Sequence, residues 1–294
     1  MSFRFKKVFQ FVHTYLNFRR AQNLRTLGFC PVLIPEGDFF LHCWFRDKKS
    51  SNTLIFIHGL LDSSAGFRRL AKYLLNEDCN LLLLDLPGFG WSQYPKWPYA
   101  YSIDGFAKIW LKSLRKYGLL KEKNFLLGHS LGGLVAQHMV LLEKESSFEG
   151  LILLAPGNSP HPERDKMRDL LLPKNPDQVD SLWDHLFFDK KNSPNWFLKK
   201  YILWLCAGYP YKALEEDTLL REQEVFLGQK IRKYKNKVLL IAGSNDEIVT
   251  SKQIKSLSGF LKNVETKFLP CTKHALHWES AHDLAPLIKK FLCS

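Results

Sequence analysis

Short, almost wholly apolar runs recur along the chain, and between them apolar residues fall at helical spacing. The apolar runs are Thr53–Ile57, Asn80–Leu84, Asn124–Leu127, Gly150–Leu154 and Lys237–Ile241. The helical segments are about 63–76, 102–117, 131–145, 251–261 and 280–292. Strands buried on both faces are apolar throughout, because helices cover the two sides of a parallel sheet. The pattern therefore predicts an α/β fold with a mainly parallel sheet flanked by helices.

Two parts of the chain depart from this alternation. Pro31–Ile34 and Phe39–Phe45 flank the turn residues Glu36-Gly37-Asp38, which predicts a β-hairpin. Between Gly157 and Asn236, prolines and large aromatic residues accompany helical segments, and no convincing strand is found. A segment of this length is too long for a plain loop. It predicts a helical insertion over the sheet.

The first twenty residues are basic, and their apolar residues also fall at helical spacing, on one face. The apolar positions are Phe5, Val8, Phe9, Val12, Tyr15 and Leu16, and the basic ones are Arg4, Lys6, Lys7, Arg19 and Arg20. Residues 1–20 therefore suit either a helix in an anionic membrane surface or a helix docked on the domain. Polar residues interrupt every apolar stretch, so neither a signal peptide nor a transmembrane helix is expected. We expect a cytoplasmic protein, free or peripheral at the membrane.

Charge and cysteine usage exclude several classes of function. The net charge of +13 would suit nucleic acid, but no nucleic-acid-binding motif accompanies it, and no such partner is expected. The six cysteines are scattered, without Cys-x-x-Cys pairs or zinc-ligand spacing. Free thiols in a reducing compartment are therefore expected, and no metal site.

The segment Gly128-His129-Ser130-Leu131-Gly132 carries the strongest chemical signal. A Gly-x-Ser-x-Gly match alone is weak evidence, because chance produces it in roughly one chain of this length in ten. Here it follows a predicted buried strand and opens a predicted helix, and such a bend exposes the serine at the carboxyl edge of the sheet. Gly128 and Gly132 avoid collisions at the bend. Ser130 is therefore the candidate nucleophile.

A serine nucleophile needs a base and an orienting acid. In a fold of this kind the acid and then the histidine follow the serine in sequence, each at the end of a later strand. Asp246 and His274 each come directly after an apolar strand. We predict that Asp246 orients His274, which takes the serine proton. Glu247 and His277 are the respective competitors, and His274 is favoured because it lies nearer the strand end.

Two backbone N–H groups are candidates for holding an oxyanion. One belongs to Leu131, at the N-terminus of the helix that follows Ser130. The other belongs to Leu60, which follows a strand that ends in His58-Gly59. His58 and Gly59 are supporting residues, because they shape the turn that directs the Leu60 N–H inward.

Together these motifs resemble the α/β-hydrolase superfamily. The resemblance rests on His58-Gly59, Asp85-Leu-Pro-Gly-Phe-Gly-Trp-Ser92, the bend at Ser130, Gly243-Ser-Asn-Asp246 and His274-x-x-His-x-Glu279. Tyr101-Ser-Ile-Asp-Gly105, the helical segment after Ala155-Pro-Gly157 and the basic N-terminus are most similar to membrane-associated monoacylglycerol lipases and family V bacterial lipases and esterases. The chain departs from the family at Lys273, where a glycine usually precedes the catalytic histidine.

The resemblance implies an α/β-hydrolase fold, with an eight-stranded type of sheet and a helical cap inserted after the sixth strand. The expected division is an N-terminal helix at 1–28, a core at 29–156 and 237–294, and a cap at 157–236. The implied activity is cleavage of a carboxylic ester, such as a monoacylglycerol, through an acyl-enzyme and without a cofactor. A carbon–carbon bond hydrolase or thioesterase with the same triad is one alternative. A non-catalytic binding protein is another.

The cap sequence suggests candidates for the substrate pocket. Asn195–Leu205 is strongly apolar and would suit a lipid chain, so Trp196 and Trp204 are candidate pocket residues, together with His277. His161, Arg164 and His185 are expected at the surface.

Overall fold

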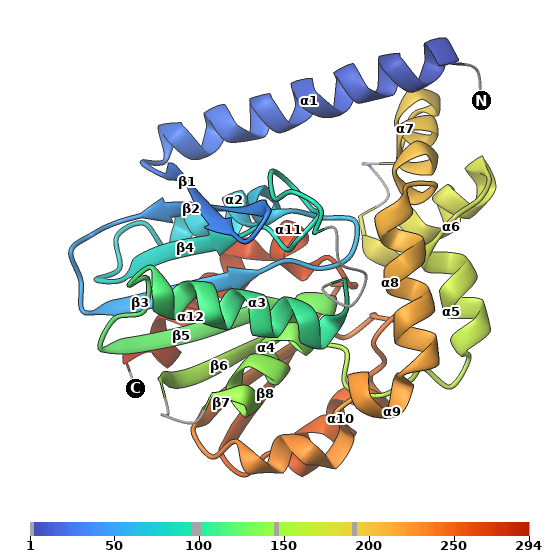
Figure 1. The fold of residues 1–294 in the computed structure, drawn as a ribbon. Helices are drawn as coiled ribbons and strands as arrows, with labels where there is room; N and C mark the ends of the chain where they lie inside the picture. Colours follow the sequence, from blue (N-terminus) through green and yellow to red (C-terminus); the bar gives the residue numbers. More distant parts are fainter. Residues whose placement is uncertain (1–2, 96–100, 144–146, 190–192, 294) are drawn as a thin grey trace.

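The computed structural model describes residues 3–95, 101–143, 147–189 and 193–293, in which an eight-stranded sheet carries helices on both faces (Figure 1). The strands are β1 Cys30–Glu36, β2 Phe39–Arg46, β3 Asn52–Ile57, β4 Asn80–Leu84, β5 Lys123–His129, β6 Phe148–Leu154, β7 Lys237–Gly243 and β8 Val264–Leu269. Their order across the sheet is β1-β2-β4-β3-β5-β6-β7-β8. β2 is antiparallel to β1 and β4, and the other neighbours are parallel. The predicted hairpin and parallel sheet are confirmed.

The helices fall into three groups. Those packed on the sheet are α2 Arg68–Tyr73, α3 Ile103–Lys116, α4 Leu131–Leu142, α10 Ser251–Phe260, α11 Leu276–Glu279 and α12 Ala281–Cys293, with the 3₁₀ segment η1 Ser64–Phe67. Those between β6 and β7 are α5 Arg164–Leu171, α6 Pro176–Leu186, α7 Trp196–Cys206, α8 Tyr209–Leu220 and α9 Glu222–Val225, followed by the 3₁₀ segment η4 Gly228–Lys233. The N-terminal helix is α1 Phe3–Thr26. We refer to the segment between β6 and β7 as the cap.

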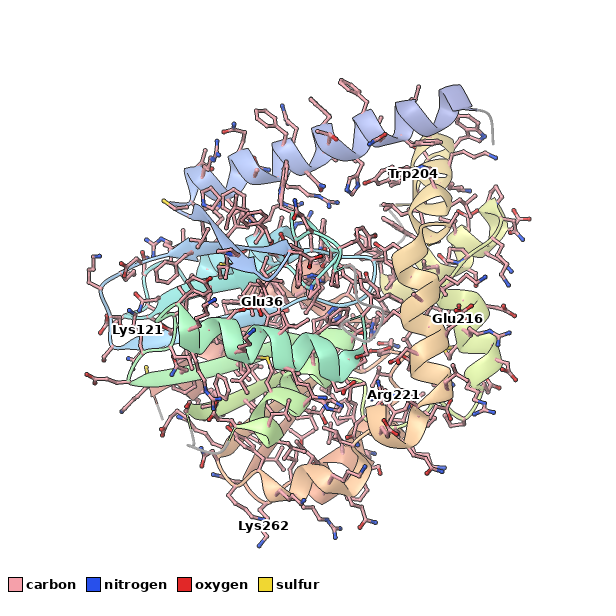
Figure 2. The ribbon with its side chains drawn as sticks, in the orientation of Figure 1. Glu36, Lys121, Trp204, Glu216, Arg221 and Lys262 are labelled. Atoms are coloured by element: carbon pink, nitrogen blue, oxygen red, sulfur yellow. The ribbon has the colours of Figure 1, made fainter. Side chains whose placement is uncertain are left out.

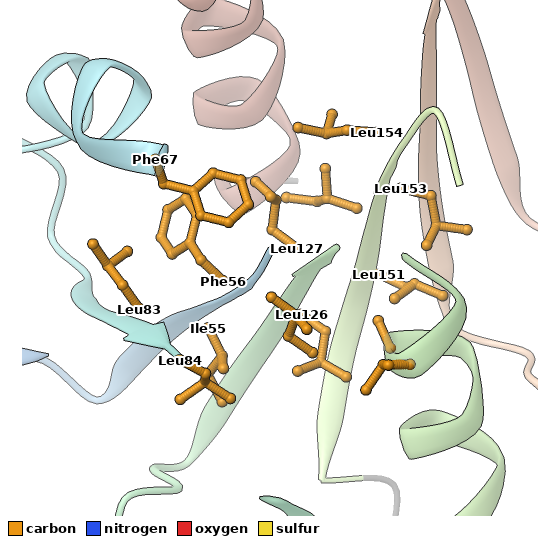
Figure 3. Packing of buried hydrophobic residues seen from close by; sticks show 14 of the residues in the cluster. Ile55, Phe56, Phe67, Leu83, Leu84, Leu126, Leu127, Leu151, Leu153 and Leu154 are labelled. Carbon is orange, nitrogen blue, oxygen red and sulfur yellow. The ribbon is translucent and has the colours of Figure 1, made fainter. Parts of the chain in front are cut away.

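The core lies where the central strands meet the helices that cover them. Figure 3 shows Ile55 of β3 and leucines of β4, β5 and β6 along the sheet, with the Phe56 and Phe67 rings side by side, all of them removed from solvent. Full burial of such a side chain contributes roughly 1.5–3 kcal/mol. The sheet therefore gives the loops at its carboxyl edge a rigid base.

The cap is attached to the core through α3. At the start of α9, the Arg221 guanidinium donates to the Asp104 carboxylate on α3 at 3.0 Å, and Figure 2 labels this arginine at the lower end of α8. Burial would raise the pKa of Asp104, but its hydrogen bonds with Lys108 and Arg221 lower it to about 2. The contact is thus an ion pair at neutral pH.

The helix α1 spans the core and the cap (Figure 1). Leu24 is buried in the core, while Phe9 packs against Trp204 of α7, which Figure 2 labels near α1. His13 Nδ1 also lies 2.7 Å from the Tyr201 hydroxyl of α7. None of the helices in the described part of the chain has the length and apolarity needed to cross a bilayer.

The prediction of a single apolar face on α1 is wrong. Phe9 is buried against the cap, whereas Val8 and Tyr15, assigned to the same face, are about half exposed. The helix has two apolar sides, because residues 8, 11, 15 and 18 follow one row of helical spacing and Phe9 belongs to another. One side docks on the protein, and the other faces outward.

Candidate active site

Ser130 sits on a strained bend between β5 and α4. Its φ of 53° and ψ of −118° are rare for a residue with a side chain. A Cβ on Gly132 would lie 2.2 Å from the Ile57 carbonyl oxygen, and a Cβ on Gly128 would lie 2.4 Å from the Gly132 carbonyl oxygen. Both glycines are therefore required by the close approach of backbone segments, as the sequence motif predicts.

The structure brings Ser130, His274 and Asp246 into one hydrogen-bonded chain. The Ser130 Oγ lies 2.8 Å from His274 Nε2, and His274 Nδ1 lies 2.8 Å from Asp246 Oδ2. The three residues follow β5, β8 and β7 respectively, and the parallel strands β5 to β8 end at the same edge of the sheet. An imidazole held in this way can accept the serine proton at Nε2 while Nδ1–H donates to the carboxylate.

The Asp246 carboxylate is held by the backbone as well as by histidine. Its Oδ1 accepts the N–H groups of Ile248 and Val249, both at 2.9 Å. The competing acid, Glu247, lies 64% exposed and faces His185 Nε2 at 3.4 Å. Of the two candidate acids, Asp246 is therefore the one that bonds His274, and its second oxygen is already held by the backbone.

The competing histidine, His277, faces a different carboxylate. Its Nε2 lies 3.2 Å from Asp62 Oδ2, and its ring packs on Phe67 and on His129. It is the second residue of α11, and through Phe67 its ring packs against η1. It is not among the residues that line the cavity above Ser130.

The two candidate oxyanion donors lie beside Ser130. Leu60 and Leu131 both line the cavity with it, and within the described residues neither backbone N–H has a hydrogen-bond acceptor. His58 supports the loop before Leu60, because its Nδ1–H donates to the Gly59 carbonyl at 2.8 Å and its Nε2 accepts the Leu86 N–H at 3.0 Å. Backbone donors without an acceptor beside a nucleophile can stabilise an oxyanion.

His129, within the serine motif, has a role that sequence reasoning missed. Its Nε2–H donates to the His274 carbonyl at 2.9 Å, which links the serine strand to the histidine loop. Burial, and then the neighbouring His277 and His274, lower the pKa of His129 well below its usual value. The ring is therefore neutral. Its place in the motif, next to Ser130, was the only signal of this contact.

A mainly apolar cavity of about 250 Å³ extends from Ser130 beneath the cap. Its lining includes Leu60, Leu131, Met167, Leu171, Tyr211, Leu214, Phe226, Ile248 and Val249, with His161, Arg164, Arg168, Glu215 and Glu222 as polar members. Arg164 pairs with Glu222 at 2.9 Å and Arg168 with Glu215 at 3.3 Å. No three His, Cys, Asp or Glu side chains in the described residues are grouped as a metal ion would require.

Several predictions about the pocket are wrong. Trp204 packs on α1 instead of lining the cavity, because α7 lies on the outer side of the cap, and Trp196 is 63% exposed. Arg164 is 59% exposed, as the sequence suggested, and both it and the partly buried His161 also border the cavity. The apolar sequence of α7 is explained by its packing against α1.

Known proteins resemble this chain in sequence over part of its length and in fold over nearly all of it. A family model for the alpha/beta hydrolase fold matches residues 52–193. The pimeloyl-[acyl-carrier protein] methyl ester esterase of Pseudoalteromonas atlantica is 34% identical over 37% of this chain and 39% of its own length. The first curated relatives are matched over only 30% to 39% of their own lengths.

Solved structures extend the likeness to nearly the whole chain. A protein named as a lipase from Acinetobacter baumannii matches with a TM-score of 0.81 and 21% identity, over 97% of this chain and 95% of its own. A bacterial membrane phospholipase A matches with a TM-score of 0.79 and 22% identity, over 96% of this chain and 92% of its own. At such identities the likeness concerns the fold.

Proposed function

We propose that this chain, which has the α/β-hydrolase fold, cleaves carboxylic esters with Ser130 as the nucleophile. The observation that carries the proposal is the chain of 2.8 Å contacts from Ser130 through His274 to Asp246. It lies at one end of an apolar cavity, beside two free backbone donors. This arrangement suits an acyl transfer reaction better than binding alone.

In the acylation step that we propose, the Ser130 oxygen attacks the ester carbonyl carbon while its proton passes to His274 Nε2. The carbonyl oxygen becomes negative and accepts hydrogen bonds from the Leu60 and Leu131 N–H groups. Asp246 accepts the Nδ1–H of the imidazolium. The tetrahedral intermediate then expels the alcohol, which takes the proton from Nε2, and the acyl group remains on Ser130.

Deacylation repeats the same steps with water in place of serine. Water gives a proton to His274 Nε2 as its oxygen attacks the acyl carbon, and the same two N–H groups hold the negative oxygen. The intermediate expels the Ser130 oxygen, which recovers the proton from His274. The products are the carboxylic acid and the free enzyme. Every proton is accounted for within the triad, water and the alcohol.

We infer that the substrate carries a medium-length acyl chain, as in a monoacylglycerol. The 250 Å³ cavity is somewhat smaller than the roughly 300–1,000 Å³ typical of drug-sized ligands, and each buried methylene would contribute about 0.8 kcal/mol. Residues 157–236 then act as the cap that encloses this chain. The P. atlantica relative, named as a methyl ester esterase, supports an ester as the substrate class.

The proposal is tested with a fluorophosphonate probe and p-nitrophenyl esters of graded chain length. We expect the wild type to be labelled, Ser130→Ala to escape labelling, and the rate to peak at intermediate chain length. Thr218→Ser, which changes a cavity residue by one methyl group, is the matched control and should be labelled like the wild type. A wild type that is neither labelled nor active on any ester would contradict the proposal.

We also propose that the outward side of α1, with the adjoining end of α7, docks on an anionic membrane surface. We call this surface the aromatic face, defined as Val8, Phe11, Tyr15, Phe18, Trp196 and Phe197. All six side chains are more than two-fifths exposed, and Phe11 is 72% exposed. Exposed apolar side chains that follow one row of a helix, as residues 8, 11, 15 and 18 do, mark interaction sites, and aromatic rings suit the membrane interface. The exposed Arg19 and Arg25 suit anionic headgroups.

Vesicle sedimentation tests this docking. Phe11→Ser combined with Phe18→Ser should lower binding to vesicles containing phosphatidylserine by roughly tenfold, because two interfacial rings are removed. Tyr73→Ser, at a similarly exposed aromatic on α2, is the control. Binding should also weaken with salt. Equal binding by the double variant and the control would refute docking through the aromatic face.

A further inference from the structure

The loop that carries His274 is hydrogen-bonded to the cap on both sides of the histidine. The Lys273 ammonium donates to the Asp184 carbonyl near the end of α6. On the other side, the Ala275 N–H donates to the Leu186 carbonyl at 2.9 Å. The Lys273 side chain supplies a contact with the cap that a glycine, the residue expected here from the family resemblance, could not make.

Glu279 joins the same two segments with its carboxylate. Its Oε1 accepts the N–H groups of Phe188 and Asp189, just after α6, at 2.5 and 3.2 Å. Its Oε2 accepts the Lys273 N–H at 3.2 Å. One side chain on α11 therefore binds three backbone donors, two in the cap and one in the histidine loop. Hydrogen bonds to an ionised acceptor are about twice as strong as neutral ones.

We propose that Glu279 and Lys273 are positioning residues through which the cap sets the place of the His274 ring. The inference rests on the proposed function, because it assigns these residues to the reaction carried out by Ser130. From the core side, His129 bonds the His274 carbonyl, and Asp246 and Ser130 bond the ring. The cap contributes the contacts on either side of it in the chain. The cap thus helps to position the catalytic base and also lines the cavity.

Proton transfer from Ser130 tolerates only a small displacement of the His274 ring. A base acts at a heavy-atom distance of about 2.6–3.2 Å, and the present 2.8 Å between Ser130 Oγ and His274 Nε2 lies within that range. A displacement of about 1 Å can lower a rate roughly 100-fold. Glu279→Gln places an amide NH₂ against a backbone N–H, so one side of the bridge must open. Lys273→Met removes only the bond to Asp184.

The test compares Glu279→Gln and Lys273→Met with Glu265→Gln. Glu265 lies on β8, where it pairs with Lys267 at 3.1 Å, and serves as the matched control. For each variant, kcat and KM on p-nitrophenyl butyrate, the rate of fluorophosphonate labelling and the thermal unfolding midpoint are measured. A fourth readout is the low-field proton of the His274–Asp246 hydrogen bond in NMR, assigned by its loss in Asp246→Ala. This signal requires no turnover.

We expect Glu279→Gln to lower kcat and the labelling rate about 10- to 100-fold, with KM within about threefold and a broadened low-field proton. Lys273→Met should show a smaller loss of the same kind, and it carries the test if Glu279→Gln does not fold. Rates and an NMR signal equal to those of the control would overturn the proposal, as would a change in KM alone. An inert wild type would instead contradict the ester hydrolase function, and the NMR signal would still decide the positioning role.

Discussion

Two histidine–aspartate pairs lie side by side in this protein, and only one is placed to act as a base. His274 has Asp246 at 2.8 Å from Nδ1 and Ser130 at 2.8 Å from Nε2. His277 has Asp62 at 3.2 Å from Nε2, while its Nδ1 is buried without a hydrogen-bond partner in the described part of the chain. A carboxylate partner therefore does not by itself allow a histidine to act as the base. The nitrogen opposite the carboxylate must face the nucleophile.

The largest expected effect separates the two histidines. His274→Ala should lower kcat on a p-nitrophenyl ester by at least about 10³-fold, because Ser130 loses its base. His277→Ala should lower it less than about tenfold, since His277 contacts neither Ser130 nor the cavity. Steady-state kinetics on the two purified variants measures both effects. Equal losses of kcat in the two variants would contradict the assignment of His274, and not His277, as the base.

Substitution of the two aspartates should separate a loss of activity from a loss of stability in the same way. Asp246→Asn should lower kcat by roughly 10³- to 10⁴-fold, because an amide favours the wrong tautomer of His274. Asp62→Asn should leave kcat within about tenfold but lower the free energy of unfolding by about 1–3 kcal/mol, since a charge-assisted hydrogen bond to His277 is lost. Urea unfolding alongside kinetics distinguishes the two outcomes. A stable but inactive Asp62→Asn would contradict the comparison.

Lowering the pH should remove the stabilising effect of the Asp62–His277 pair. Burial would raise the pKa of Asp62, but its hydrogen bond and charge interaction with His277 hold it below its usual value. A carboxylate with a lowered pKa contributes stability above its unfolded pKa of about 4, and that contribution is lost as the pH falls through the folded value. The stability difference between wild type and Asp62→Asn should therefore be full at pH 6 and should shrink below pH 4. A difference that grows in acid would refute this assignment.

The smallest expected effect concerns His129, which lies between the two pairs. Because the folded protein keeps this ring neutral, the unfolded chain takes up a proton below about pH 6.5 that the folded chain does not. This histidine should reduce stability by up to about 1.4 kcal/mol per pH unit below that point. His129→Gln keeps an N–H donor for the His274 carbonyl, and its stability should fall less between pH 6.5 and 5. Unfolding curves at several pH values check this, and parallel pH dependence in the two proteins would contradict it.

The sheet was predictable from sequence because its signal is local. Each strand buried on both faces shows as an apolar run, and the glycines around Ser130 report a backbone approach that only glycine allows. The positions of Asp246 and His274 followed from the strand ends. These features depend on a few neighbouring residues and on the chain order of the fold.

The lining of the cavity was not predictable, because it depends on how helices of the cap pack. α7 has the composition of a pocket wall, yet Phe197, Tyr201 and Trp204 pack against α1, far away in the sequence. His161 and Arg164 look like surface residues, yet they border the cavity. The contact of Glu279 with the residues after α6 was likewise invisible, since nothing local to either segment indicates it.

The pairing of α1 with α7 has a consequence for synthesis of the chain. His13 and its partner Tyr201 are separated by 188 residues. At roughly 5–20 residues per second, a ribosome needs about 10–40 s to make the intervening chain. During that interval the side of α1 that later carries Phe9 against Trp204 lacks its native partner, and both apolar sides of the helix are uncovered. The period in which this helix is most exposed to membranes and chaperones therefore comes before the protein has a cap or an active site.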